Sequence, residues 1–150
     1  KVIKLNPKHV DSRISKGYCL SELSDYKGAH KSYKEALDID PTNNVILNNI
    51  GWVYHKQRKY LQAIPFYEKS IKLNRNYVHV WNSKAVTLYK LKKYPEALKC
   101  CEKAIKLGTK DKETLSCFKK IKKMIPKQPT KKQTRSGKNP KGTAGNDYFI

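Results

Sequence analysis

The sequence predicts an all-α protein built as an open solenoid of helix hairpins. First, small and large apolar residues recur along the chain with a period of 34 residues. Second, the apolar residues within a period are spaced as on one face of a helix. Third, the break between the two helical stretches of a period is too short to hold a strand. The columns in register are Gly17, Gly51 and Ala85; Ala29, Ala63 and Ala97; Tyr26, Tyr60 and Tyr94; Leu20, Tyr54 and Leu88; Leu37, Ile71 and Ile105; and Ile39, Leu73 and Leu107.

Each period predicts one repeat of two helices. In the second repeat, Ile50 and Tyr54 mark the apolar face of the first helix, and Ala63, Tyr67 and Ile71 mark that of the second. The three full repeats are expected at residues 10–43, 44–77 and 78–111. The first helices are expected at residues 10–23, 44–57 and 78–91, and the second helices at residues 27–39, 61–73 and 95–107.

Small residues are expected where the two helices of a repeat cross, because a larger side chain would hold the backbones apart. Pro95 suits the first turn of its helix, where its missing N–H would be unpaired anyway. Pro65 lies a turn deeper in the equivalent helix, where a mild kink is expected. The pairs expected to face each other are Gly17 and Ala29, Gly51 and Ala63, and Ala85 and Ala97.

The pattern extends past both ends of the full repeats. Residues 1–9 carry the apolar slots of a preceding second helix, closed by Pro7, so we expect a leading half-repeat and a chain cut from a longer protein. Residues 112–125 carry an apolar stripe with lysines on the other face, which predicts a capping helix over the last hydrophobic surface. The stripe consists of Leu115, Phe118, Ile121 and Ile125.

Residues 126–150 predict a basic, irregular tail. Their composition of Lys, Thr, Gly and Pro offers too little apolar surface to offset the entropy of ordering, so we expect the tail to be disordered or ordered by a partner. An apolar trio, Tyr148, Phe149 and Ile150, ends it and is expected to serve as an anchor.

The charge balance of the chain points toward acidic partners. In 150 residues, 33 Lys and Arg stand against 12 Asp and Glu, a net charge of +21. Only four of the basic residues are Arg, which disfavours a reader of base sequence. No apolar run is long enough to span a membrane, and the four cysteines form no CxxC pair, so we expect reduced thiols and a cytoplasmic location.

Catalytic and metal chemistry find no support in the sequence. The four histidines, His9, His30, His55 and His79, lie in different repeats without metal-ligand spacing. Cys19 has no motif typical of a nucleophile around it, and the glycines form no nucleotide-binding loop. We therefore expect no enzyme activity, no cofactor and no metal.

The repeat pattern resembles that of the tetratricopeptide repeat family. The second repeat carries the family's succession of aliphatic or aromatic, Gly, aromatic, Ala and aromatic residues. These residues are Leu47, Ile50, Gly51, Tyr54, Ala63 and Tyr67. The resemblance covers residues 10–111. The sequence departs from the pattern at Arg13, Cys101, Arg75 and Thr109.

The resemblance implies that the first helices line a concave wall that holds peptides or helices of partners. Asparagines there can bond to an extended peptide backbone, aromatic rings offer flat anchors, and lysines supply positive charge. The residues expected to bind a partner are Tyr18, Asn48, Asn49, Trp52, His55, Lys56, His79, Asn82, Val86, Tyr89 and Lys90, with Ile14 and Ser21 beside them. Trp52 could equally pack between neighbouring repeats.

One use of this wall in the family is a clamp for the C-terminal carboxylate of heat-shock chaperones. The clamp needs Lys and Asn in the first repeat, Asn in the second, and Lys and Arg in the third. The matching positions here hold Ile14, Tyr18, Asn49, His79 and Ser83. Asn49 alone fits, so chaperone tails are not expected as partners.

Two functions follow from these features. The first is a non-catalytic scaffold or adaptor that binds an acidic protein segment in its groove as a subunit of a larger assembly. The alternative is a ribonucleoprotein-associated module whose Lys-rich capping helix and tail contact RNA phosphates. The scaffold is favoured because the tail has no aromatic residues interleaved with Arg, as single-strand binders do. The lysines could also do no more than keep the helix exteriors soluble.

Overall fold

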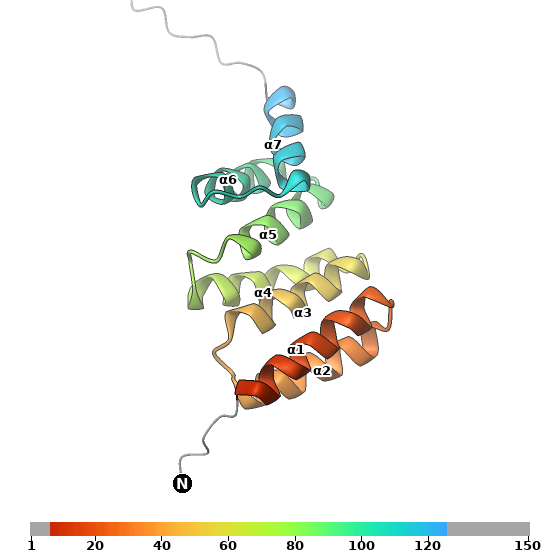
Figure 1. Cartoon of the computed structure of the whole chain (residues 1–150). Coiled ribbons are helices and arrows are strands. Elements are labelled where there is room, and N and C mark those ends of the chain that lie inside the picture. Colours follow the sequence, from red (N-terminus) through yellow and green to blue (C-terminus); the bar gives the residue numbers. More distant parts are fainter. Residues whose placement is uncertain (1–6, 126–150) are drawn as a thin grey trace, which may run out of the picture.

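The computed structural model describes residues 7–125, which form seven α-helices and no strand. The helices pair as three antiparallel hairpins stacked one on another, and a seventh helix closes the stack (Figure 1). Their bounds are α1 Pro7–Glu22, α2 Tyr26–Ile39, α3 Asn44–Lys56, α4 Tyr60–Leu73, α5 Val78–Lys90, α6 Tyr94–Lys106 and α7 Lys112–Met124. The predicted all-α solenoid is thereby confirmed.

The start of α1 differs from the prediction. The repeat spacing assigns Pro7 to the end of a preceding unit, whereas Pro7 is the first residue of α1. Proline suits this position because a first helical residue needs no N–H partner. The residues before Pro7 lie outside the described range. So does the predicted tail, 126–150, with its proposed anchor Tyr148, Phe149 and Ile150.

The three hairpin turns share one backbone conformation. In each turn, the residue two positions before the second helix begins has a left-handed backbone conformation. These residues are Ser24 (φ 62°), Arg58 (φ 60°) and Lys92 (φ 59°). In the second repeat the N–H of Lys59 donates to Tyr54 O at 2.9 Å, and equivalent bonds close the other two turns. This is the Schellman closure, in which one left-handed residue lets the chain satisfy the last carbonyls of the helix.

The helix crossings are packed more tightly than the sequence predicted, and against a different partner. A Cβ atom on Gly51 would lie 2.6 Å from Tyr67 Cε1, and one on Gly17 would lie 2.7 Å from Tyr33 Cε1. The closest neighbours of these glycines are therefore tyrosine rings, not the alanines of the second helix. Ala29, Ala63 and Ala97 are fully buried nonetheless.

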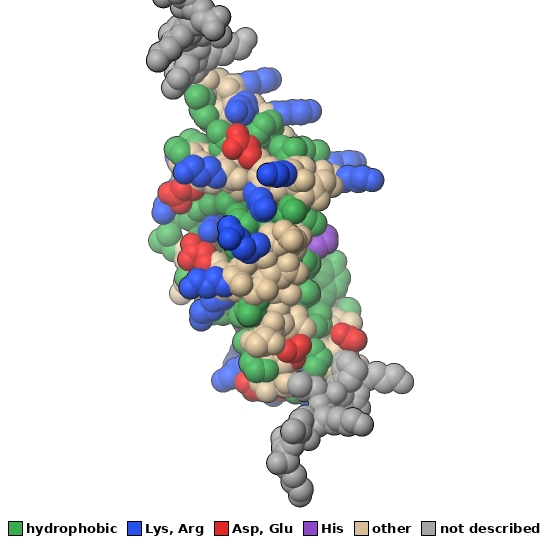
Figure 2. Space-filling model, turned by 90° about the vertical axis from the view of Figure 1, so that its left-hand side faces the viewer, with side chains coloured by type: hydrophobic (Ala, Val, Ile, Leu, Met, Phe, Trp, Pro, Cys, Tyr) green, Lys and Arg blue, Asp and Glu red, His purple; other side chains and the backbone are tan. Residues whose placement is uncertain are grey.

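Basic side chains are distributed over the outside of the stack. Figure 2 shows one face, on which Lys and Arg side chains spread from the middle of the stack to its α7 end. Ion pairs take up some of these charges: Lys56 with Glu22, Lys84 with Glu68, Arg13 with Glu35 and Lys122 with Glu102.

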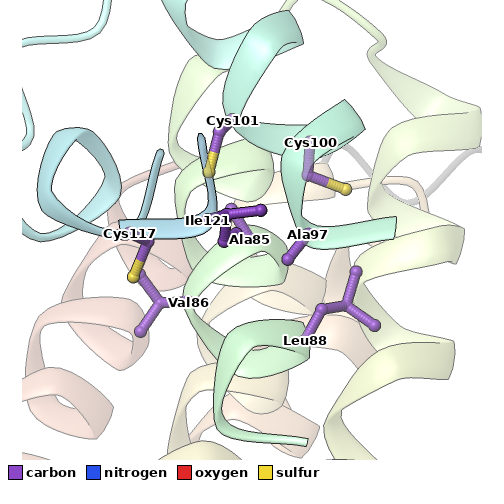
Figure 3. Packing of buried hydrophobic residues seen from close by; sticks show 8 residues of the cluster. All are labelled: Ala85, Val86, Leu88, Ala97, Cys100, Cys101, Cys117 and Ile121. Carbon is purple, nitrogen blue, oxygen red and sulfur yellow. The ribbon is translucent and has the colours of Figure 1, made fainter. Parts of the chain in front are cut away.

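The last helix covers the hydrophobic end of the third repeat. Ile121 of α7 is fully buried and lies beside Ala85 of α5 and Cys101 of α6 (Figure 3). Helix α7 begins at residue 112, 34 residues after the start of α5, so it occupies the place of the first helix of another repeat. Asp111 caps it by accepting the Thr114 N–H at 2.8 Å.

Within residues 7–125, no three His, Cys, Asp or Glu side chains converge as a metal site would require. None of the helices there is long and apolar enough to span a membrane.

Candidate partner-binding groove

A groove of about 310 Å³ runs along one side of the stack, beside the first helix of each repeat. These helices, α1, α3 and α5, also contact one another in succession, and α7 follows α5. The groove is lined by Tyr18, Ser21, Tyr33, Asn48, Asn49, Trp52, Tyr77, His79, Asn82, Ser83, Val86, Asp111 and Glu113. We use "the groove" for this set throughout.

Seven of the residues predicted to bind a partner line the groove, together with Ser21 from the flanking positions. The seven are Tyr18, Asn48, Asn49, Trp52, His79, Asn82 and Val86. They come from all three first helices, because each helix presents the same face after one period of 34 residues. Tyr18 is 57% exposed, so an apolar ring stands open at one end of the groove.

His55 does not line the groove, contrary to the prediction. Its ring stacks on Trp52, with centroids 4.5 Å apart and planes 7° from parallel. Its Nδ1 lies 2.7 Å from Thr87 Oγ1 in α5, so His55 is a buried link between the second and third repeats. Trp52 thus stacks on His55 of its own helix and also lines the groove.

Lys56, Tyr89 and Lys90 also lie outside the groove, contrary to the prediction. The Lys56 ammonium pairs with Glu22 at 2.6 Å, which joins α3 to α1. Tyr89 packs against the core of the third repeat and contacts Tyr94. Lys90 is exposed, and Ile14 of α1 packs against the core of the first repeat. The positive charges that the sequence placed in the groove are therefore absent from its lining.

Five lining residues were missed by the sequence prediction: Tyr33, Tyr77, Ser83, Asp111 and Glu113. A signal for two of them was present. Asp111 and Glu113 stand 34 residues after Tyr77 and His79, so extending the period into α7 would have brought them to the same wall. Tyr33 belongs to α2, a second helix, and lines the groove because its ring extends between the two helices of the first repeat. The spacing of residues along the chain does not show how far a ring extends.

The amides of the groove are held in fixed positions. Asn48 Nδ2 donates to Asn49 Oδ1 at 3.4 Å, and the Tyr33 hydroxyl is hydrogen-bonded to Asn49. Thr109 Oγ1 donates to Asn82 Oδ1 at 2.9 Å, so Asn82 also fixes the turn before α7. One of the two acceptor positions of the Asn82 amide oxygen is therefore already used within the chain.

Two polar atoms at the groove are buried without a hydrogen-bond partner in the described part of the chain. They are Ser21 Oγ and Asn48 Oδ1. Ser21 is 3% exposed and Asn48 is 6% exposed. A buried acceptor without a partner is costly, by about 1 to 3 kcal/mol. A bound chain with N–H groups at this depth would remove that cost.

Burial keeps His55 and Tyr33 neutral at pH 7. Burial lowers the pKa of His55 to about 4, with the Lys90 charge acting in the same direction. Burial raises the pKa of Tyr33 to about 12, against the hydrogen bond from Asn49. Burial likewise raises the pKa of the Cys100 and Cys101 thiols, so neither thiol is a reactive thiolate. The arrangement suits binding through amides, hydroxyls and rings.

Comparison with protein families places three stretches of this chain in one group. The model described as "Tetratricopeptide repeat" matches residues 45–77 and 78–108, and the model described as "TPR repeat" matches residues 17–58. Together these stretches run from residue 17 to residue 108, well over half of the chain.

Curated relatives share the same stretch of helices. The chain is 30% identical over 87 residues to the probable UDP-N-acetylglucosamine peptide N-acetylglucosaminyltransferase SPINDLY of Solanum lycopersicum, which is 58% of this chain and 9% of that protein. It is 27% identical over 74 residues to anaphase-promoting complex subunit 3 of Schizosaccharomyces pombe, which is 49% of this chain and 11% of that protein. The chain thus spans about a tenth of the length of these relatives.

Solved structures show the same fold. The first TPR domain of Spaghetti (RPAP3), bound to the HSP90 peptide SRMEEVD, superposes with a TM-score of 0.74 at 24% identity, covering 81% of this chain and 97% of that one. The Sgt2 TPR domain from Aspergillus fumigatus superposes with a TM-score of 0.75 at 19% identity, covering 99% and 95%.

Proposed function

The chain belongs to the tetratricopeptide repeat family, and from that premise we propose that it is a non-catalytic scaffold. It holds an extended segment of a protein partner in the groove and works as a subunit or adaptor of a larger intracellular assembly. The four free cysteines fit a reducing, cytoplasmic compartment.

The groove itself carries this proposal. Aromatic rings of Tyr18, Trp52 and Tyr77 offer apolar contact area, and fixed amides stand between them. Two buried acceptors, Ser21 Oγ and Asn48 Oδ1, are unpaired in the described chain and suit the N–H groups of an extended backbone. Such aromatic and amide contacts suit the binding of a partner segment.

Similar proteins support a peptide or protein as the partner. One structural neighbour was solved with an HSP90 peptide and another, the TPR2B domain of yeast Sti1, with an Hsp70 peptide. A curated relative is by name a subunit of a protein complex. At the chaperone-clamp positions, however, this chain has no Lys or Arg, and four of the five residues there line the groove: Tyr18, Asn49, His79 and Ser83. We therefore propose a partner other than a chaperone tail.

A second candidate function rests on the outer face of α7. Four lysines, Lys112, Lys119, Lys120 and Lys123, surround a shallow depression that also contains Leu115 and Ser116. Such a cluster would attract the phosphates of RNA without reading its sequence. This face is separate from the groove, so the two candidate functions can be tested independently.

Selection from a displayed library of random peptides of about ten residues, with the full chain as bait, tests the groove. We expect recovered peptides to lose affinity at least about tenfold on Trp52→Ala, because an aromatic anchor in an interface contributes about 2 kcal/mol or more. Leu61→Ala is the matched control, since Leu61 is an exposed apolar residue of α4 outside the groove.

Two results would contradict the proposal. Recovered peptides that bind the Trp52→Ala variant as well as the parent would move binding to another face. A single-stranded RNA that binds the chain in low micromolar range, and that Lys119→Ala with Lys120→Ala releases, would favour the second function in the absence of groove-dependent peptides. Melting temperatures of all variants separate lost binding from lost folding.

A further inference from the structure

The charge of the groove is opposite to the charge of the chain. The chain carries +21, yet the groove contains two carboxylates, Asp111 and Glu113, and no Lys or Arg. Chance alone would place several lysines among its lining residues in so basic a protein. The groove therefore has an acidic end, at α7, in a basic molecule.

The neighbouring lysines are directed elsewhere by their own contacts. Lys56 of α3 pairs with Glu22 at 2.6 Å, and Lys84 of α5 pairs with Glu68 of α4 at 3.3 Å. Lys112, which stands between the two groove carboxylates in sequence, lines the outer depression of α7 instead. Figure 2 shows one face of the stack on which Lys and Arg side chains are numerous.

The two carboxylates retain capacity for a ligand. Asp111 Oδ2 accepts hydrogen bonds from the Thr114 N–H at 2.8 Å and the Thr114 hydroxyl at 2.7 Å, while Oδ1 makes none within residues 7–125. Glu113 is exposed and forms no ion pair in that same range. Capping accounts for one oxygen of Asp111 and leaves the remaining acceptors facing outward.

The floor of the groove points to the same kind of occupant. Asn48 Oδ1 and Ser21 Oγ are more than nine-tenths buried, line the groove and have no partner in the described structure. The amide nitrogen of Asn48 is already used toward Asn49, so the open group is an acceptor. Acceptors on the floor and carboxylates at one end call for a ligand rich in hydrogen-bond donors.

We propose that the groove recognises an extended peptide segment carrying Lys or Arg, with its cationic group at Asp111 and Glu113. This inference rests on the proposed function, because it names the partner of the same groove. The backbone N–H groups of the segment bond to Asn48 Oδ1 and Ser21 Oγ. Trp52 and Tyr77 cover apolar or cationic parts of its side chains. The partner is thus basic in the groove, where the sequence alone predicted an acidic one.

The short range of the carboxylate contacts explains how a basic chain can bind a basic segment. At physiological salt, charges separated by more than about 8 Å are largely screened, so repulsion from the distant lysines of the chain is weakened at the groove. A hydrogen-bonded cation at Asp111 or Glu113 is attracted at contact distance, where the interaction between two charges is strongest.

The test applies the same peptide selection and sorts the winners by their dependence on Trp52. Peptides that lose affinity on Trp52→Ala should be enriched in Lys and Arg. Their affinity should fall about tenfold in the Asp111→Asn, Glu113→Gln double variant. Asparagine caps a helix as well as aspartate does, so α7 keeps its cap in this variant. Glu96→Gln with Glu102→Gln is the charge-matched control, since both residues lie on α6 outside the groove.

The synthetic peptides SRMEEVD and SRMKKVK, which differ in three charged positions, provide a second measurement on the full chain. We expect SRMKKVK to bind at least about tenfold more tightly, with the difference reduced in the double variant. Trp52-dependent winners enriched in Asp and Glu, or unaffected by the double variant, would overturn the inference and leave the scaffold proposal standing. The absence of any Trp52-dependent peptide would instead overturn the scaffold proposal itself.

Discussion

The first two repeats and the third solve the same helix crossing in different ways. In the first two, a glycine on the first helix lies against a tyrosine ring on the second: Gly17 against Tyr33, and Gly51 against Tyr67. In the third, the equivalent positions hold Ala85 and Cys101, both fully buried. A larger residue on one helix is thus matched by a smaller one on the other, so that each crossing stays closely packed.

This difference determines what each crossing does beyond packing. The Tyr33 ring passes through the crossing and its hydroxyl reaches the groove, where it bonds to Asn49. The Tyr67 hydroxyl lies 3.4 Å from Thr87 Oγ1, in the link to the third repeat. Cys101 instead directs its sulfur to Thr114 O of α7, at 3.7 Å. The first two crossings connect the core to the groove and to the next repeat, and the third joins the core to its cap (Figure 3).

The largest expected effect is on stability, at the second crossing. Gly51→Ala should lower the free energy of unfolding by about 3 kcal/mol, because the new Cβ would overlap a fully buried tyrosine ring. The gain in helix propensity, about 1 kcal/mol, is too small to offset this overlap. Urea denaturation followed by circular dichroism measures the change.

A double variant tests whether the crossing explains the effect. Gly51→Ala with Tyr67→Cys gives the second crossing the composition of the third, so its cost should be well below the sum of the two single costs. Ala85→Gly, at the third crossing, should cost about 2 kcal/mol, about half from helix propensity and about half from the lost burial of its methyl group. Additive costs in the double variant would show that the two residues do not share one space.

The sequence predicted the repeats well because the period of 34 residues and the helical spacing are local signals. The second helices begin within one residue of their expected positions, as at Tyr60 and Tyr94. The tyrosine-filled crossings were missed because periodicity shows which face is buried but not how far a ring reaches.

The groove was predicted in part for the same reason. The positions of Asn49 and Trp52 in the groove follow from the helical face of α3. His55 instead contacts Thr87 of α5, and this contact depends on how the third repeat stacks on the second. The acidic character of the groove could not be read from net charge. It arises because Lys56 is paired at the rim and because α7 turns Glu113, but not Lys112, toward the groove.

The second prediction concerns the junction between the second and third repeats at acidic pH. His55 bonds to Thr87, and burial lowers its pKa from 6.5 to about 4. Between about pH 6.5 and pH 4, the His55 imidazole is therefore protonated in the unfolded chain and neutral in the folded chain. Stability from this group is fully present above about pH 6.5 and is lost as pH falls toward about 4, by about 3 kcal/mol in all.

His55→Gln provides the comparison for this measurement. Its unfolding free energy should change less than that of the parent between pH 7 and pH 4. The pKa of His30 is also lowered, by burial and by Lys59, and its contribution remains in both proteins. Equal pH dependence of parent and variant would mean that His55 protonates without disturbing the junction.

The smallest expected effect lies in the turns, where the repeats have the same conformation and equivalent substitutions should change stability equally. Arg58 and Lys92 are exposed and occupy the left-handed region at φ 60° and 59°, which glycine adopts without a steric penalty. Arg58→Gly and Lys92→Gly should therefore each stabilise the chain by about 0.5 to 1 kcal/mol, since the relieved strain exceeds the added freedom of the unfolded state. Because both turns have the same closure, the two increments should agree and should add in the double variant. A clear gain at one turn and a loss at the other, measured by thermal and urea unfolding, would show that the repeats differ in their turns as well as in their crossings.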